Sequence, residues 1–259
     1  MPAMTTTADR CRGVLLGLAT GDKNGGPIRM ALRVAESLQD CGRFDRDDIL
    51  KRYVNWWREG AFDTGPVSAR ALELITAGMP VDEATTQVHR EFGGKTAGCN
   101  PAHRSAPLSM CAAIADKDLA TCAEAEARLT HHDALAGKIA AAVNRVCRML
   151  IRGVAWDDTL IPIAAFTEQG RPVNDGGFAP DALRAAVHFV GKATDFASAL
   201  DRSLAFAGPS NYCPVLVGAV AGARWGASAV PPQALAHVEI LPRVRAAADA
   251  LAAGWAEAR

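Results

Sequence analysis

Three aspartates of this chain lie in short loops that also contain glycine: Asp22 in GDKNGGP, Asp63 in FDTGP and Asp175 in PVNDGGF. Two carboxyl groups on either side of a glycosidic bond can hydrolyse it by acid and base catalysis without a metal ion. Aspartate is also common in turns and at helix caps, where its carboxylate accepts backbone N–H bonds. The three residues are therefore candidate catalytic groups, and a turn or cap role is the alternative for each.

A second group of candidates precedes an apolar segment near the C-terminal end of the chain, in PSNYCP at 209–214. Pro214 suits the first turn of a helix, where its missing N–H is not needed. Unpaired backbone donors at such an end attract anions, and for Ser210 or Asn211 a role as the cap of that helix is the structural alternative. The thiolate of Cys213 would be favoured there if it were exposed, which makes Cys213 a candidate nucleophile. A buried, inert thiol is the alternative.

The remaining candidates are basic or imidazole side chains. Arg104 lies in GCNPAHRS, and its planar guanidinium suits a phosphate or a carboxylate, although a surface arginine on a polar loop is the alternative. His131 and His132 are not part of an HExxH pattern and have no carboxylate at ligand spacing, so they predict no metal site.

Composition excludes several classes of protein. The 259 residues have a formal net charge of zero and no basic cluster, so we expect no binding to nucleic acid or to an anionic membrane surface. The apolar run at 213–223 is too short to span a bilayer, and the N-terminus lacks the features of a signal peptide. Seven scattered cysteines without a CxxC pair predict reduced thiols. We therefore expect a soluble cytoplasmic protein without bound cofactor.

Apolar residues recur at helical spacing along almost the whole chain, and few windows alternate with period two. The pattern predicts an all-α protein with one domain over residues 1–259. The expected helices cover 8–20, 28–39, 47–59, 67–77, 81–89, 105–115, 120–129, 134–152, 180–192, 195–205, 214–225 and 232–256.

Glycine repeats every four residues in two of these helices, at 13, 17 and 21 and again at 218, 222 and 226. Glycine costs about 1 kcal/mol in a helix interior relative to alanine, so close helix packing is the expected reason. If the two stripes meet antiparallel, the end of the first helix approaches residues 207–213. The alternative is that each stripe faces a different neighbour.

Six segments, in order, resemble those of the ADP-ribosylglycohydrolase family (dinitrogenase-reductase activating glycohydrolase type). RGVLLGLATGD resembles the opening helix and its G-D-A-L-G turn, and MALRVAESL resembles the helix after the first metal motif. DTGPVSARALELITAG is similar to the G-x-T-T-R-x-A-L segment, and AGCNPAHRSAPLSM to the G-N-G-S-x-M-R-V-A-P-L loop. ARLTHHDALAGKIAA resembles A-R-L-T-H-x-x-P, and AGPSNYCPVLVGAVAGA resembles G-G-D-T-D-T-I-A-A-I-A-G-A.

The resemblance implies a compact, roughly orthogonal helical bundle with a cleft where helix ends converge. It places Asp22, Asp63 and Asp175 near that cleft and brings a small nucleotide-like ligand to it. By the same resemblance the expected substrate-binding residues are Thr64, Ser68, Asn100, Arg104, His131, Ser210, Asn211 and Cys213.

The family holds a pair of magnesium ions with T-D-D-T before the M-A-L helix and with the late D-T-D-T. Here the insertion that leads to the first motif is absent, and the matching positions read GGPI at 25–28 and PSNY at 209–212. Magnesium prefers carboxylate oxygens in octahedral geometry, and neither segment supplies one. Asp22 alone cannot hold two cations. We therefore expect a divergent member without the metal pair.

Three functions follow from these observations. The first is a metal-independent hydrolase that cuts a glycosidic or other C–N bond in a nucleotide-like molecule. The second is a pseudoenzyme that binds ADP-ribose or a protein partner without turnover. The third is a different enzyme on the same fold that uses Cys213. The first needs two carboxylates facing one cleft, and the third needs an exposed thiol.

Overall fold

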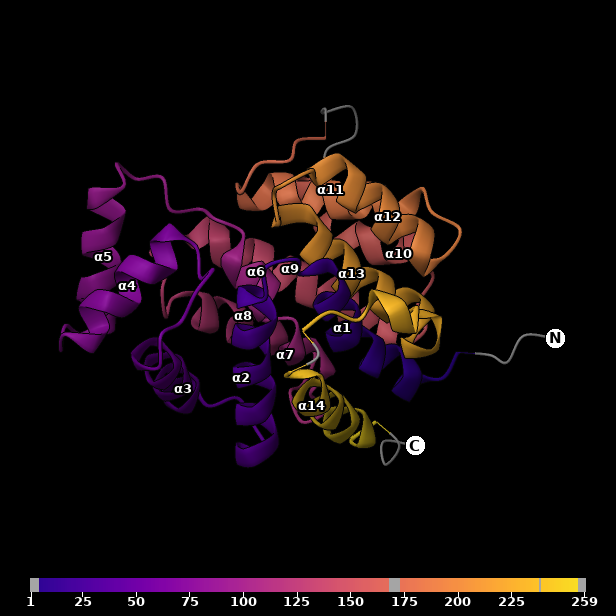
Figure 1. The fold of residues 1–259 in the computed structure, drawn as a ribbon, viewed down its shortest axis with the longest axis horizontal. Coiled ribbons are helices and arrows are strands. Elements are labelled where there is room, and N and C mark those ends of the chain that lie inside the picture. Colours follow the sequence, from indigo (N-terminus) through magenta and orange to yellow (C-terminus); the bar gives the residue numbers. More distant parts are fainter. Residues whose placement is uncertain (1–4, 168–172, 238, 256–259) are drawn as a thin grey trace.

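The computed structural model describes residues 5–167, 173–237 and 239–255, and within these ranges the chain is helical with no β-strand (Figure 1). The all-α prediction is confirmed. An isolated antiparallel bridge joins Gly98 to Phe178. The α-helices are α1 (Thr7–Gly21), α2 (Gly26–Cys41), α3 (Arg46–Arg58), α4 (Pro66–Thr76), α5 (Val81–Glu91), α6 (Asn100–Arg104), α7 (Pro107–Met110), α8 (Leu119–Ala127), α9 (Ala134–Ile151), α10 (Trp156–Leu160), α11 (Ala179–Gly191), α12 (Phe196–Ala207), α13 (Tyr212–Trp225) and α14 (Leu241–Ala253). Three 3-10 helices are η1 (Ile161–Phe166), η2 (Ala227–Ala229) and η3 (Pro232–Ala234).

Helices α1 and α13 form the centre of the fold, with α11 and α12 on one side and α14 on the other (Figure 1). Nearly every residue of α13 is buried, as expected for a helix that is apolar on all its faces. Helices α4 and α5 lie at one end of the molecule, where they share a small separate cluster of apolar side chains (Figure 1).

The two glycine stripes meet, and they meet antiparallel. A Cβ added to Gly13 would overlap the carbonyl group of Gly222, and one added to Gly17 would overlap that of Gly218. Glycine is therefore required here because the backbones of α1 and α13 touch. This close approach brings the end of α1 next to the start of α13, and with it the loops at 22–25 and 208–211.

Two predicted helices differ from the observed ones. The segment predicted as one helix at 105–115 contains only the short helix α7 and begins after α6 has ended at Arg104, because Pro101 and Pro107 each begin a new short helix without an N–H donor. The buried guanidinium of Arg148 donates hydrogen bonds to the backbone carbonyls of this irregular stretch, at 108, 109, 111 and 114. The helix predicted from 232 begins only at Leu241, after two consecutive prolines and η3.

Helix α10 and the adjoining η1 were not expected from the sequence. Among the described residues, no helix is both long enough and apolar enough to cross a membrane.

Candidate active site

Asp22 directly follows α1, and its carboxylate accepts the backbone N–H groups at the start of α2. Oδ1 accepts from Asn24 at 3.2 Å and from Gly25 at 2.8 Å, and Oδ2 accepts from Ile28 at 2.8 Å. The side chain is fully buried. Asp22 therefore organises the short loop that joins the two helices, and both of its oxygens are engaged.

Asp63 lies opposite this loop, just before α4, and its carboxyl group is accessible to solvent. Its Oδ1 accepts from Asn24 Nδ2 at 3.4 Å. Partial desolvation and then the nearby charge of Asp22 raise the pKa of Asp63 above its ordinary value. A carboxyl group in this setting can exchange a proton more readily near neutral pH than an ordinary surface aspartate.

The amide of Asn211 joins the two carboxylates. Its Nδ2 donates to Asp22 Oδ1 at 2.8 Å and lies 3.5 Å from Asp63 Oδ2. The orientation of the amide follows from its other end, because the backbone N–H of Lys23 can only donate and lies 2.9 Å from Asn211 Oδ1. The two carboxylates therefore share one N–H₂ group at the junction of α1, α2 and α13.

The alternative role of Ser210 and Asn211, a side-chain cap of α13, is not observed. Neither Ser210 nor Asn211 makes a side-chain cap bond to this helix. Asn211 instead turns toward the carboxylates, and Ser210 Oγ donates to the backbone carbonyl of Asp175 at 3.4 Å. Asp175 itself is exposed, and its carboxylate makes no described hydrogen bond to Asp22 or Asp63.

A cleft of about 530 Å³ borders this junction. Asn100 lines it and donates from Nδ2 to the carbonyl oxygen of Thr64 at 3.1 Å, next to Asp63. Tyr212, which follows Asn211, forms another part of the wall with a side chain that is 41% exposed. The full lining is Pro66, Val67, Phe92, Gly94, Lys95, Ala97, Gly98, Asn100, Asp133, Leu135, Gly177, Phe178 and Tyr212.

Arg104 does not line this cleft. Its side chain is fully buried, and Nε pairs with Glu126 Oε1 at 2.7 Å, an oxygen that also accepts from Tyr53 at 2.7 Å. Arg104 Nη1 donates to the hydroxyl of Ser68 at 3.3 Å. Arg104 and Ser68 thus belong to a buried polar cluster rather than to the exposed junction.

His131 is buried between this cluster and the cleft. Its Nδ1 lies 2.8 Å from Thr130 Oγ1, whereas Nε2 has no hydrogen-bond partner among the described residues. A Cβ on Gly98, which lines the cleft, would lie 3.4 Å from that Nε2. Burial and the charge of Arg104 hold the pKa of His131 well below its usual range, so the ring is neutral.

Cys213 is buried, with 1% of its surface exposed, and burial raises the pKa of its thiol to about 12. The exposed, low-pKa thiolate that a nucleophilic role requires is therefore not present at this position.

Three polar residues of the junction were not selected from the sequence: Lys23, Asn24 and His237. Lys23 and Asn24 lie in the glycine-containing loop after Asp22, and they belong to no sequence pattern that would indicate a functional role. His237 is 215 positions from Asp22 in sequence, yet its Nε2 lies 2.6 Å from the Asp22 carbonyl oxygen. No sequence pattern links these two residues.

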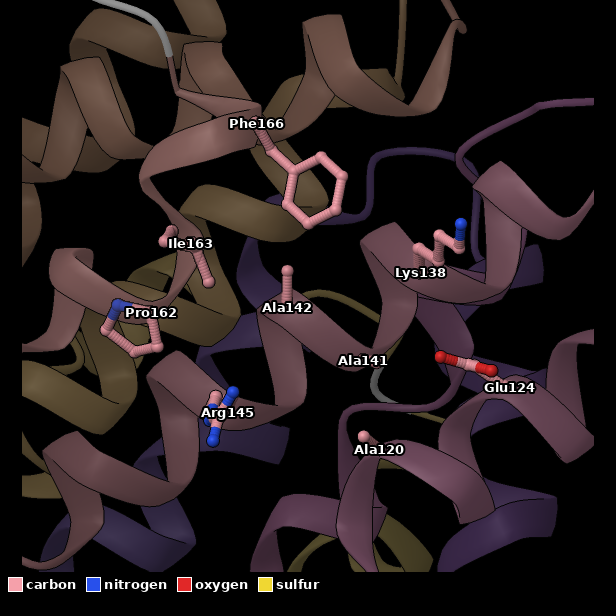
Figure 2. A pocket seen from close by; sticks show the side chains of 9 residues that line it. All are labelled: Ala120, Glu124, Lys138, Ala141, Ala142, Arg145, Pro162, Ile163 and Phe166. Atoms are coloured by element: carbon pink, nitrogen blue, oxygen red, sulfur yellow. The ribbon is translucent and has the colours of Figure 1, made fainter.

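A smaller cavity of about 190 Å³ lies between α8, α9 and η1 and contains none of the candidate residues (Figure 2). In Figure 2, Glu124 and Lys138 border it on the right, and Pro162, Ile163 and Arg145 on the left. In the described part of the chain, no group of three or more His, Cys, Asp or Glu side chains could hold a metal ion.

The fold is all-helical, and two carboxylates that both contact the Asn211 amide lie beside a cleft. Comparison with known proteins identifies the family to which this fold belongs. The ADP-ribosylglycohydrolase family model matches residues 28–259, and the chain belongs to this family. The match begins just after the loop that contains Asp22.

Individual relatives agree with this assignment. The chain is 22% identical over 289 residues to the ADP-ribosyl-[dinitrogen reductase] glycohydrolase of Rhodospirillum rubrum, covering 95% of this chain and 96% of that protein. It is 23% identical over 278 residues to the ADP-ribosylarginine hydrolase Tri1 of Pseudomonas putida (strain GB-1), covering 87% and 73%. A solved structure described as an ADP-ribosylglycohydrolase-related protein complex superimposes with a TM-score of 0.80 at 26% identity, covering 97% of this chain and 99% of that one.

Proposed function

We propose that this protein is a hydrolase that cleaves the glycosidic bond of an ADP-ribosylated or similar nucleotide-like substrate without a bound pair of metal ions. The observation that carries the proposal is the junction itself. Asp63, an accessible carboxyl group with a raised pKa, lies beside a cleft and shares the Asn211 amide with Asp22. Two relatives act on ADP-ribosylated substrates, as their names state, which supports the choice of substrate.

In this proposal Asp63 is the catalytic acid and base. Protonated Asp63 donates its proton to the leaving group as the glycosidic bond breaks. Its carboxylate then accepts a proton from the water that attacks the anomeric carbon, which restores the starting form of Asp63. Asp22 and Asn211 are positioning residues, because Asp22 is fully buried and Asn211 holds both carboxylates in place. Asp175, the third aspartate selected from the sequence, is exposed and contacts Ser210 through its backbone carbonyl, and it receives no role in this reaction.

The residues of the junction do not fit a pair of divalent cations. The oxygens of Asp22 already accept three backbone N–H groups, and the N–H₂ of Asn211 points at both carboxylates, where a cation would need an oxygen ligand. The N–H₂ group of Asn211 thus presents the positive end of its dipole to the carboxylates, at the place where a metal ion would present its charge. This arrangement supports metal independence, and no step of the reaction is routed through a metal.

Asn100 and Tyr212 are proposed to contact the substrate directly, because both line the cleft. His131 is proposed to stand behind Gly98 as a neutral donor or acceptor, and Thr64 positions Asn100 through its carbonyl oxygen. Arg104 and Ser68 act behind these residues through the buried cluster.

A binding protein without turnover is the second candidate, and one observation favours it. Both oxygens of Asp22 are consumed by hydrogen bonds inside the protein, so the junction offers a single accessible carboxylate. Hydrolysis with two carboxylates needs both groups to reach the substrate or its water.

The test is release of ADP-ribose from ADP-ribosylated arginine, measured with excess EDTA and with added magnesium, for the wild type and for Asp63→Asn. We expect equal rates in both conditions and a loss of about 10²-fold or more in the variant, the size of a general acid–base contribution. A rate that requires magnesium contradicts metal independence. Binding of ADP-ribose without release, with Asp63→Asn unchanged, supports the binding protein instead.

A further inference from the structure

Two non-glycine residues of the described chain have backbone φ angles in the left-handed region: Asp63 at 49° and His237 at 59°. Residues with a Cβ are uncommon in this region, although Asp and His enter it more often than most, and such conformations persist where the surrounding structure fixes them, often at functional sites. The two residues are 174 positions apart, yet both contact the short loop at 22–25. The strain is therefore concentrated on two sides of one loop.

His237 holds this loop from the C-terminal side. Its Nε2 lies 2.6 Å from the carbonyl oxygen of Asp22, and because a carbonyl only accepts, the ring nitrogen donates. The ring also packs against the backbone of Gly25, since a Cβ on that glycine would lie 2.9 Å from His237 Cε1. Gly25 has a φ of 97°, so it has two reasons to lack a side chain.

A second contact from the same segment reaches the loop. Glu239 pairs with Arg29, and Arg29 Nη1 in turn donates to the carbonyl oxygen of Gly25 at 2.9 Å. The guanidinium of Arg29 lies 4.8 Å from the centroid of the Phe62 ring, next to Asp63. The segment before α14 is thus connected to both ends of the loop.

Asp63 holds the loop from the other side. A Cβ on Gly26 would overlap the carbonyl group of Asp63, and Asn24 Nδ2 lies 3.4 Å from Asp63 Oδ1. The loop therefore lies between two strained residues, one of which has the accessible carboxylate and the other an imidazole that bonds only the main chain.

We propose that His237 is a positioning residue of the candidate active site: it clamps the backbone of Asp22 and Gly25 so that the loop keeps Asp22 and Asn24 against Asp63 and Asn211. The clamp concerns the protein without ligand, and only its catalytic importance rests on the proposed function. It connects the start of the C-terminal helix to the site, a link that the chain order does not suggest.

The test is amide hydrogen exchange in His237→Gly, read by NMR at the backbone N–H groups of Gly25 and Ile28, which bond to the Asp22 carboxylate. Glycine accepts the left-handed backbone without strain but has no donor. We expect these two amides to exchange about tenfold faster or more, which corresponds to about 1.4 kcal/mol in the free energy of local opening.

Arg243→Ala is the matched control. Arg243 also connects the C-terminal part of the chain to α2, through Glu36 at 2.7 Å, but it does not touch the loop. We expect it to leave the exchange of Gly25 and Ile28 unchanged. Equal protection of these amides in His237→Gly and in the wild type overturns the proposal, as does equal loss of protection in His237→Gly and Arg243→Ala.

His237→Asn adds a conservative comparison, since asparagine enters the left-handed region more readily than most residues and keeps an N–H donor. We expect it to recover part of the protection, and recovery no better than glycine overturns the hydrogen bond as the cause. Thermal melting with ADP-ribose then tests the connection to function, with a smaller ligand-induced shift expected for His237→Gly. A wild type that does not respond to ADP-ribose counts against the proposed function and leaves the exchange result intact.

Discussion

Two polar clusters of this molecule contain the residue types expected of an active site, and they differ in what surrounds them. Around Arg104, Glu126 and Tyr53 every side chain is fully buried, and the ion pair is direct. Around Asp22 and Asp63 one carboxylate is buried and the other is accessible. The same chemistry therefore supports the fold in one cluster and is available to a ligand in the other.

The difference shows that residue type and motif position do not decide a role by themselves. Arg104 lies in the loop that resembles the substrate-binding segment of the family, yet its guanidinium is consumed by Glu126 and Ser68. By the sequence resemblance, Asn211 falls in the segment matched to a metal motif, and in the structure its amide joins two carboxylates. Burial and hydrogen-bond partners separate these cases, and neither can be read from the sequence.

The largest expected effect on stability concerns the buried polar cluster around Arg104. Arg104→Ala leaves the Glu126 carboxylate buried without its partner, which typically costs about 3–5 kcal/mol of stability. Arg12→Ala is the control, because its pair with Asp249 is exposed and such pairs contribute about 0–1 kcal/mol. Urea unfolding of both variants measures the difference. A loss in Arg104→Ala no larger than in Arg12→Ala would mean that the cluster opens to solvent.

The next effect concerns the helix contact that creates the junction. Gly17→Ala places a methyl group on the carbonyl of Gly218, so α1 and α13 must separate, and overpacking of this kind costs about 1–3 kcal/mol. Gly137→Ala in α9 is the matched control, because its Cβ would meet its nearest neighbour at 3.3 Å, a distance at which a small shift suffices. We expect Gly137→Ala to be nearly neutral. Thermal unfolding and ADP-ribose binding of both variants test whether the contact also shapes the site.

Much of the fold could be predicted from the sequence, because the signals that fix it are local or periodic. The spacing of apolar residues predicts most helices within two or three residues. The glycine stripes left two interpretations open, and only the structure shows that they meet. The helices predicted at 105–115 and from 232 are too long because proline interrupts both segments. Around α7 the distant side chain of Arg148 bonds the backbone carbonyls instead.

The site was harder to predict for the same physical reason. Asp22, Asp63 and Asn211 were selected from the sequence and lie together in the structure, but their hydrogen bonds depend on three helix ends meeting. His237 and Lys23 reach the junction from loops without periodicity, so no local signal marks them. Whether the selected residues act on a substrate remains a prediction that the experiments above address.

A third prediction converts the shared amide into a third carboxylate. Asn211→Asp removes the N–H₂ donor and brings three negative groups together at the junction, so we expect a lower melting temperature at neutral pH. Magnesium or manganese should restore part of the loss in this variant, because hard cations prefer such oxygen ligands. The wild type should not respond. Melting curves with EDTA or with metal measure both, and a wild type stabilised by magnesium would contradict metal independence.

The smallest expected effect on stability concerns Asp63 itself. The pKa of Asp63 is higher in the folded protein than in the unfolded chain, so folding disfavours the ionised carboxylate. The free energy of unfolding therefore falls as the pH rises through the folded pKa and the carboxyl group ionises. Asp63→Asn should therefore be slightly more stable than the wild type at pH 7, and the difference should vanish below about pH 3.9, the ordinary aspartate pKa. Unfolding curves across this pH range measure it. Asp175→Asn is the control, because that carboxyl group is exposed and away from Asp22, and it should leave stability unchanged at every pH. An Asp63→Asn variant that is more stable but no longer hydrolyses substrate would mean that the accessible carboxylate lowers stability and is kept for activity. In the buried cluster around Arg104, by contrast, the charged groups stabilise the fold.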